Sequence, residues 1–440
     1  MSSAGGPAEV EVLVVGGGMA GAMAALSAAR AGARVLVARR ALGATAISSG
    51  AVDVAPGPGA PLSDLQAQRV PPEQAAAAVA RLHPAHPYAV LSARLNRLGE
   101  SLRFCAQALP ELFDAPPERN VLLPTPLSTV KPAAMAQRAQ LLADAAALPE
   151  RVAVVQLQAL PSCDARLVAA GLEEAGRALG RKIGAVEIAS TFFRTVDDPH
   201  RPVHELAAML DAEGAVEALA AELRPRLPEG TQAVLFPPVL GRARADAAAR
   251  LSAALGLPCA ELLSPAPSVP GVRLQEALDR ALKRAGVELV EAAAECRDLH
   301  SGSYALGERG VAARAAVLAS GKFIGGGIER IGRFRETVFG LPVFAGARLV
   351  GGEYVGDLLD ERVESDQVAF HAGVRIDASL RPLRADGAPA SPSLFAAGSV
   401  IRGYDPASDK TGLGVAIFTG FLAGEEAVAA AAGRGVEGSM

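Results

Sequence analysis

The first forty residues constrain the fold more than any other part of this 440-residue sequence. An apolar run at 9–15 enters a glycine-rich turn at 16–21, an Ala-rich stretch follows, and a second apolar run occupies 33–38. This order predicts a strand, a turn, a helix and a second strand. The chain therefore begins with a complete βαβ unit of the kind that binds nucleotides.

The glycines of the turn have the G-x-G-x-x-G spacing. The first permits a tight turn, the second lets a phosphate approach the backbone, and the third lets the helix pack closely on the strand. The helix start then offers N–H groups and a positive dipole end to a pyrophosphate. Such turns also serve merely to reverse a chain, but the flanking strands favour a cofactor site. The residues that we assign to it are Gly16, Gly17, Gly18, Met19, Ala20 and Gly21.

The composition argues against several functional classes. The net charge is −4 and Lys and Arg are spread along the chain, so we expect no nucleic-acid binding. The four cysteines form no C-x-x-C pair, so we expect reduced thiols and no metal site. We see no secretory signal, and the longest apolar run, 415–432, is interrupted by two glutamates. These features predict a cytoplasmic protein.

Three apolar strands end in small residues, at 15–16, 318–321 and 395–398. Ligands of open parallel sheets lie outside the carboxyl ends of the strands. The alternative is that three buried strands simply end in turns. Together and in this order, the strand ends favour a two-part flavin fold over an NAD domain, whose site is usually one continuous block. The residues added to the cofactor site are Ser320, Gly321, Gly398 and Ser399.

These patterns predict an α/β protein with a Rossmann-like FAD/NAD(P)-binding flavoprotein fold and an inserted α/β domain. The inserted part alternates apolar strands with Ala- and Leu-rich helices. The predicted segments are 1–60 for the first part of the flavin-binding domain, 61–265 for the insertion that serves substrate or partner, and 266–440 for the second part.

The last helix is expected to begin at Gly412, Leu413 and Gly414. Its positive end can face the flavin ring and stabilise the reduced anion. The alternative is a helix start with flexible glycines and no ligand.

The second strand lacks the usual acid at its end, where a Glu or Asp binds the adenosine ribose. Ala38 is followed by Arg39 and Arg40. The arginines can bind a phosphate, stack on adenine, or lie as solvated surface at a strand end.

The chain resembles the B-subunit family of the anaerobic glycerol-3-phosphate dehydrogenase. The glycine motifs are general to flavoproteins, whereas Ser-Ser-Gly-x-x-Asp, Ala-His-Pro-Tyr and Pro-Ser-x-x-Gly-x-Arg-Leu-Gln are more particular. The matching stretches lie in order across about 10–420, at 16–21, 47–53, 85–88, 125–127, 267–275, 317–321, 394–400 and 403–406.

The resemblance implies oxidation of sn-glycerol 3-phosphate to dihydroxyacetone phosphate, with a flavin on this chain. The partners it implies are the catalytic, flavin-bearing A subunit of the dehydrogenase and its iron–sulfur C subunit. It further implies that electrons pass to quinone and that a partner holds this chain at the inner face of the membrane.

The identity of the flavin and the role of the chain both stay open. The family is described with FMN, whereas the glycine motif favours FAD. One alternative function is an electron-relay or assembly subunit that holds a flavin. Another is a stand-alone FAD-dependent oxidoreductase on another substrate.

Further candidates lie within or near the matching stretches. Ser48, Ser49 and Gly50 are expected near the flavin phosphate or ribityl chain, the alternative being a capped helix start. His86 is a candidate proton acceptor for alcohol oxidation, the alternative being a structural hydrogen bond. Arg273 is a candidate ligand of the substrate phosphate, the alternative being an exposed helical arginine.

Three charged residues are weaker candidates. Lys131 and Lys410 can meet the substrate phosphate, and Asp405 can orient the last helix.

Overall fold

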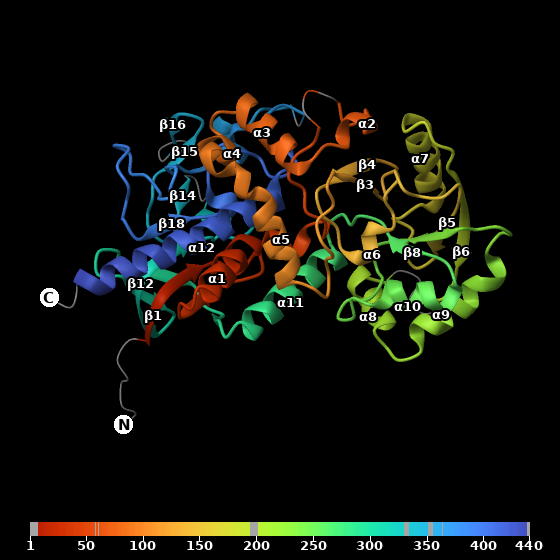
Figure 1. The fold of residues 1–440 in the computed structure, drawn as a ribbon, viewed down its shortest axis with the longest axis horizontal. Coiled ribbons are helices and arrows are strands. Elements are labelled where there is room, and N and C mark those ends of the chain that lie inside the picture. The colour runs from red at the N-terminus through yellow and green to blue at the C-terminus, as the bar shows by residue number, and fades with distance from the viewer. Residues whose placement is uncertain are drawn as a thin grey trace. The chain divides into compact units, whose positions relative to one another are not determined.

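The computed structural model divides into two compact units (Figure 1). It describes residues 8–57, 59, 61–193, 201–329, 334–350, 355–362 and 364–437. Unit 1 comprises Met1–Ala44, Ala76–Ala108 and Leu278–Met440, and unit 2 comprises Thr45–Ala75 and Leu109–Ala277. These bounds differ from the predicted segments 1–60, 61–265 and 266–440, chiefly because residues 76–108 pack with unit 1.

Unit 1 is built on a seven-stranded sheet to which both ends of the chain contribute. The strand order is β10-β11-β12-β1-β2-β9, and β18 lies beside the carboxyl half of β12. Strands β1, β2, β9, β12 and β18 are parallel, as a buried βαβ sheet requires. Their bounds are β1 (Ala8–Val15), β2 (Val35–Ala38), β9 (Glu288–Val290), β10 (Ala294–Asp298), β11 (Ser303–Leu306), β12 (Arg309–Leu318) and β18 (Leu394–Ala396). The predicted parallel α/β fold is confirmed.

Two helices from opposite ends of the chain pack on each other and on this sheet, α1 (Met19–Arg30) and α12 (Gly412–Glu437). Their backbones approach closely because Gly420 of α12 has no side chain. A Cβ atom there would lie 2.2 Å from the carbonyl oxygen of Ala20. The absence of a side chain at this position therefore permits the close approach of the two helices.

Helix α5 (Leu98–Ala108) contacts α12, and charged pairs form beside it. Arg97 and Arg94 bond Glu425 and Glu426 of α12 at 2.5 and 2.6 Å. In the part of the chain that is described, α12 has the length and apolar composition to cross a membrane, and 61% of its most apolar window is buried within the protein.

Smaller elements complete unit 1. They are α4 (Pro87–Val90), the strand pair β13 (Ile328–Glu329) and β14 (Arg335–Glu336), and the strands β15 (Val343–Ala345), β16 (Arg348–Leu349) and β17 (Gly373–Val374). Helix α3 (Pro72–Leu82) begins in unit 2 and ends in unit 1, and α11 (Val269–Arg284) does the same.

Unit 2 contains a four-stranded parallel sheet of order β6-β5-β7-β8. Apolar side chains of its strands and helices form one buried core. The strands are β5 (Arg151–Leu157), β6 (Gly184–Ser190), β7 (Ala233–Phe236) and β8 (Cys259–Glu261), with a hairpin of β3 (Val121–Pro124) and β4 (Val130–Ala133). The helices are α2 (Leu65–Gln68), α6 (Arg138–Leu141), α7 (Ala165–Ala178), α8 (Val203–Leu210), α9 (Ala215–Leu223) and α10 (Ala247–Leu255).

The substitution Gly420→Ala tests the packing of α1 against α12. Alanine normally stabilises a helix interior, but here the added methyl group collides with backbone, so we expect unfolding to become easier by about 1–3 kcal/mol. Gly433→Ala is the matched control, because no atom of the described residues lies within 4 Å of a Cβ atom at that position of the same helix. Thermal midpoints measure both. Equal midpoints for the two variants would contradict the close approach.

Candidate cofactor-binding site

The turn between β1 and α1 leaves no room for side chains. Gly16 has φ +114°, and a Cβ atom there would lie 2.1 Å from the carbonyl oxygen of Ala319, at the end of β12. A Cβ atom on Gly21 would lie 1.8 Å from the carbonyl oxygen of Gly16. Both positions therefore require glycine, for backbone conformation and for close approach.

The start of α1 carries no negative charge of its own. Gly18 is the N-cap, it makes no side-chain capping bond, and the first turn contains no acidic residue. The residues of this turn from Met19 onward are buried. The first turn itself therefore adds no carboxylate, and the positive end of its dipole suits a phosphate.

The three predicted strand ends meet at one edge of the sheet. Val15 is paired with Leu318, and Leu318 with Ala396. The amide of Ala319 donates to the carbonyl of Val15 (2.8 Å), and that of Ala397 to the carbonyl of Leu318 (2.9 Å). The structure therefore brings the glycine turn, 318–321 and 395–398 together, as the sequence predicted.

Ser320 places an orphaned hydroxyl group at this edge. Its Oγ atom is buried and makes no hydrogen bond with the described residues. A buried polar atom without a partner costs free energy, so such atoms usually meet a ligand or water. A Cβ atom on Gly321 would lie 3.7 Å from the Ser399 Oγ atom. Ser399 therefore lies beside the turn that follows Ser320.

The loop before α12 is held by its own side chains. Asp405 accepts from the amide of Ala407 (2.9 Å) and from the hydroxyl of Ser408 (2.8 Å), while its own amide donates to Asp409 (3.0 Å). The first turn of α12, which contains Gly412, Leu413 and Gly414, has no acidic residue. These bonds are consistent with the expectation that Asp405 orients the helix start.

Lys322 is a buried ammonium group that the sequence patterns did not reveal. Its Nζ atom donates to the carbonyls of Phe370 and Tyr404, the latter at 3.1 Å, and lies 5.5 Å from the Tyr404 ring centre. Burial lowers the pKa of Lys322 to about 7, although Asp405 and Asp409 oppose the shift. Its place directly after the strand end of β12 is the signal that could have identified it.

His86 lies in the interior of unit 1 and caps α4. Its Nδ1 atom accepts from the amide of Tyr88 (3.1 Å), and its Nε2 atom lies 3.4 Å from the Thr411 hydroxyl. Burial lowers the pKa of His86 to about 3. Because Nδ1 already accepts a bond, the neutral ring carries its proton on Nε2. Neither nitrogen is available to accept a proton from a substrate in this arrangement, which favours the structural alternative.

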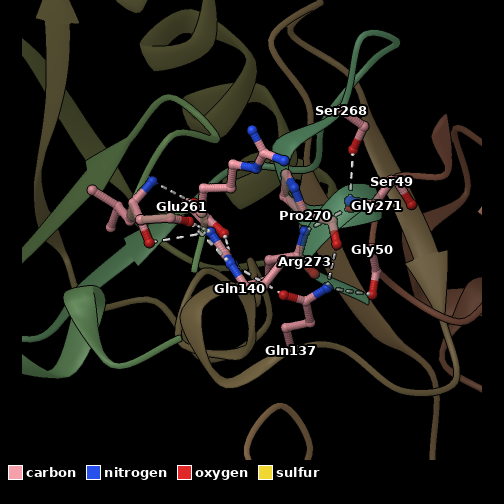
Figure 2. Close-up of polar contacts among 12 residues, drawn as sticks. Ser49, Gly50, Gln137, Gln140, Glu261, Ser268, Pro270, Gly271 and Arg273 are labelled. Carbon is pink, nitrogen blue, oxygen red and sulfur yellow. Dashed lines mark hydrogen bonds and ion pairs between the residues drawn. The ribbon is translucent and has the colours of Figure 1, made fainter. Parts of the chain in front are cut away.

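Arg273 is buried in unit 2 and forms an ion pair with Glu261 at 2.7 Å (Figure 2). Its other bonds go to Gln137 (3.0 Å) and to the carbonyls of Leu240 and Gly241. These bonds occupy the guanidinium, so a substrate phosphate finds no donor there. The alternative of an exposed helical arginine is also wrong, because Arg273 is only 1% exposed.

The same network reaches the predicted Ser48–Gly50 segment. Gln137 donates to the carbonyl of Gly50 (3.3 Å), and Gln140 donates to that of Ser49 (2.8 Å), as Figure 2 shows. The hydroxyl of Ser48 donates to the carbonyl of Thr45 (2.8 Å). The backbone of the segment is therefore fixed by amide side chains of unit 2, while the hydroxyl of Ser48 is engaged locally.

Arg39 is not solvated surface. Its guanidinium bonds both carboxylate oxygens of Asp279 (2.8 and 2.9 Å) and one of Glu291 (3.1 Å), and the side chain is 7% exposed. Burial by itself would lower the pKa of Arg39. The hydrogen bonds and charges of Asp279 and Glu291 outweigh this effect, so the pKa of Arg39 is raised. Arg40 is exposed, and a Cβ atom on Gly326 would lie 2.0 Å from its Nη2 atom.

The remaining charged candidates contact the chain itself. Lys131 pairs with Asp53 at 3.2 Å, and Lys410 donates to the carbonyl of Ala407 at 2.7 Å. Among the described residues, no group of three or more His, Cys, Asp or Glu side chains is placed to hold a metal ion.

Comparison with known proteins assigns this geometry to a family. Residues 11–415 match the model of an FAD binding domain family. The chain is 31% identical to the probable B subunit of the anaerobic glycerol-3-phosphate dehydrogenase of Halobacterium salinarum, covering 96% of this chain and 98% of that protein. It is 27% identical to the B subunit of the anaerobic glycerol-3-phosphate dehydrogenase of Yersinia pestis, covering 95% and 98%.

Among solved structures, a 3-ketosteroid Δ1-dehydrogenase from Sterolibacterium denitrificans covers 96% of this chain and 99% of its own, at 13% identity. The TM-score of this comparison is 0.40. The family match is supported independently by the glycine turn, the uncharged start of α1 and the orphaned Ser320 hydroxyl, which all fit a flavin dinucleotide.

The variant His86→Asn tests the environment of this histidine. Asparagine can keep the capping bond to Tyr88, but it does not titrate. The folded pKa of His86 is about 3 and the ordinary value 6.5, so the unfolded chain binds the extra proton between these pH values. Stability from the neutral ring is therefore complete above pH 6.5 and is lost as the pH falls towards 3.

We expect the wild type to lose stability relative to His86→Asn over this window, by at most about 1.4 kcal/mol per pH unit. Urea unfolding of both proteins from pH 8 to pH 4 measures the difference. A difference that does not change with pH would show that His86 titrates alike in both states.

Proposed function

The chain belongs to the FAD-binding domain family, and we propose that it is the flavin-bearing B subunit of an anaerobic glycerol-3-phosphate dehydrogenase. The proposed reaction is the oxidation of sn-glycerol 3-phosphate to dihydroxyacetone phosphate. The observation that carries the proposal is the similarity to proteins of that name over nearly the full length of both chains. The flavin-binding architecture of unit 1 agrees with it.

The proposed cofactor is FAD rather than FMN. A pyrophosphate distinguishes FAD from FMN, and the turn Gly16–Gly21 with the uncharged start of α1 is built for one. The Ser320 hydroxyl would supply a donor or acceptor beside it, because that atom has no partner among the described residues. Gly398 and Ser399 would line the same edge, which is bordered by β12 and β18.

The bound flavin would supply a two-electron acceptor for the hydrogen removed from the substrate carbon. The start of α12, whose first turn contains no acidic residue, would contribute the positive end of a helix dipole. Lys322 would place a buried positive charge, or its neutral amine, beside the loop that leads into α12. Its lowered pKa keeps both forms accessible near neutral pH.

The proposed partners follow from the relatives' designation as B subunits, which implies a complex with further chains. We propose a second flavoprotein, the A subunit of that complex, together with an iron–sulfur C subunit that passes electrons towards quinone. The proposed location is the cytoplasmic side of the membrane, with attachment through a partner.

One observation favours a second function, an electron-relay or assembly subunit that holds a flavin without its own substrate site. The two candidates for substrate chemistry, His86 and Arg273, are buried and engaged with groups of the chain itself. In that case the substrate would be oxidised on a partner, and this chain would only carry electrons.

Anaerobic reduction distinguishes these functions. The purified chain, alone and as the co-expressed complex, is mixed with sn-glycerol 3-phosphate, and flavin absorbance is followed. We expect the flavin of the isolated chain to bleach within seconds, with stoichiometric dihydroxyacetone phosphate. Bleaching only in the complex would support the relay function. A flavin that stays oxidised in both preparations, while dithionite reduces it, would exclude this substrate.

A further inference from the structure

The acid at a strand end lies on a different strand from that of the usual dinucleotide-binding pattern. In that pattern an acid at the end of the second strand binds the ribose hydroxyl groups. Here β2 is followed by Arg39, and the adjacent strand β9 is followed by Glu291. Ala38 and Val290 are paired, and the amide of Arg39 donates to the carbonyl of Val290 (2.9 Å). The two side chains therefore start from adjacent points on the sheet edge.

The side chain of Arg39 lies against the glycine turn. A Cβ atom on Gly17 would lie 2.9 Å from the Arg39 Cδ atom. The Nη1 atom of the guanidinium donates to both carboxylate oxygens of Asp279 of α11, and the Nη2 atom donates to Glu291. Arg39 is 7% exposed and Asp279 is 29% exposed. These charge-assisted bonds fix the guanidinium through Nη1, and Nη2 holds the second carboxylate.

Glu291 remains open towards solvent. Its side chain is 78% exposed, and its one hydrogen bond within the described residues joins its Oε1 atom to Arg39. A carboxylate is an acceptor with two oxygens, which suits two neighbouring hydroxyl groups. A guanidinium has donors alone, and that of Arg39 is already engaged with two acids.

We propose that Glu291 supplies the carboxylate that binds the ribose hydroxyl groups of the adenosine half of a dinucleotide flavin, and that Arg39 is the positioning residue that holds it beside the glycine turn. The acid is thus carried on β9 instead of β2. This inference rests on the proposed FAD, and it concerns which flavin the chain prefers, since FMN has no adenosine ribose. It also explains why an arginine replaces the expected acid.

Flavin affinity tests the assignment. The full chain is freed of flavin, and dissociation constants for FAD and for FMN are measured by quenching of flavin fluorescence. Glu291→Gln keeps the size of the side chain but removes its charge. We expect this variant to bind FAD about 10- to 100-fold more weakly, as the loss of charged hydrogen bonds implies. Its affinity for FMN should change less than about twofold.

Two further variants separate a local effect from a general one. Glu288→Gln removes the same charge at the other end of β9, where Glu288 pairs with Arg309, and should leave both affinities unchanged. Arg39→Lys keeps the charge but loses the forked geometry, so it should lower the FAD-to-FMN preference as Glu291→Gln does. The double variant should add little, because the two residues act as a unit.

The outcomes are distinct. An unchanged FAD affinity in Glu291→Gln, or an equal loss for FAD and FMN, would overturn the assignment while leaving the proposed function intact. A wild-type chain that binds neither flavin would overturn the proposed function, and the assignment with it.

Discussion

The close approach of β12 to the glycine turn is the constraint on which unit 1 depends. The carbonyl of Ala319 lies where a side chain on Gly16 would have to be, although about three hundred residues separate the two positions. Parallel pairing of β1 with β12 along their whole length holds this contact. The segments that form unit 2 lie between the two strands in sequence, so the site edge is built from both ends of the chain.

Much of unit 1 could be predicted because its signals are local. The βαβ unit, the strands at 313–318 and 393–396, and the helix from Gly412 follow from apolar runs and glycine positions, and the structure confirms them. Their meeting at one sheet edge also follows, since parallel strands direct their carboxyl ends to the same side. The bounds of the units were harder to predict, because packing of 76–108 against distant helices leaves no periodic signal.

The roles of single charged residues could not be predicted, because they depend on distant partners. Nothing near Arg273 in sequence shows that Glu261 and two carbonyls surround its guanidinium. Arg39 is likewise neutralised by acids some 240 and 252 residues away. The burial of Lys322 could not be predicted, because a lysine after a strand is ordinarily exposed, whereas here it is only 7% exposed. Sequence patterns thus predicted the backbone of the site better than its electrostatics.

The central claim is that this chain itself binds a dinucleotide flavin at the edge formed by β1, β12 and β18. The most direct test is to purify the chain alone, record its visible spectrum, and identify the released cofactor by mass. The account predicts a yellow protein that releases about one equivalent of FAD, as the glycine turn and the uncharged start of α1 require. A colourless protein that neither FAD nor FMN can reconstitute would contradict it.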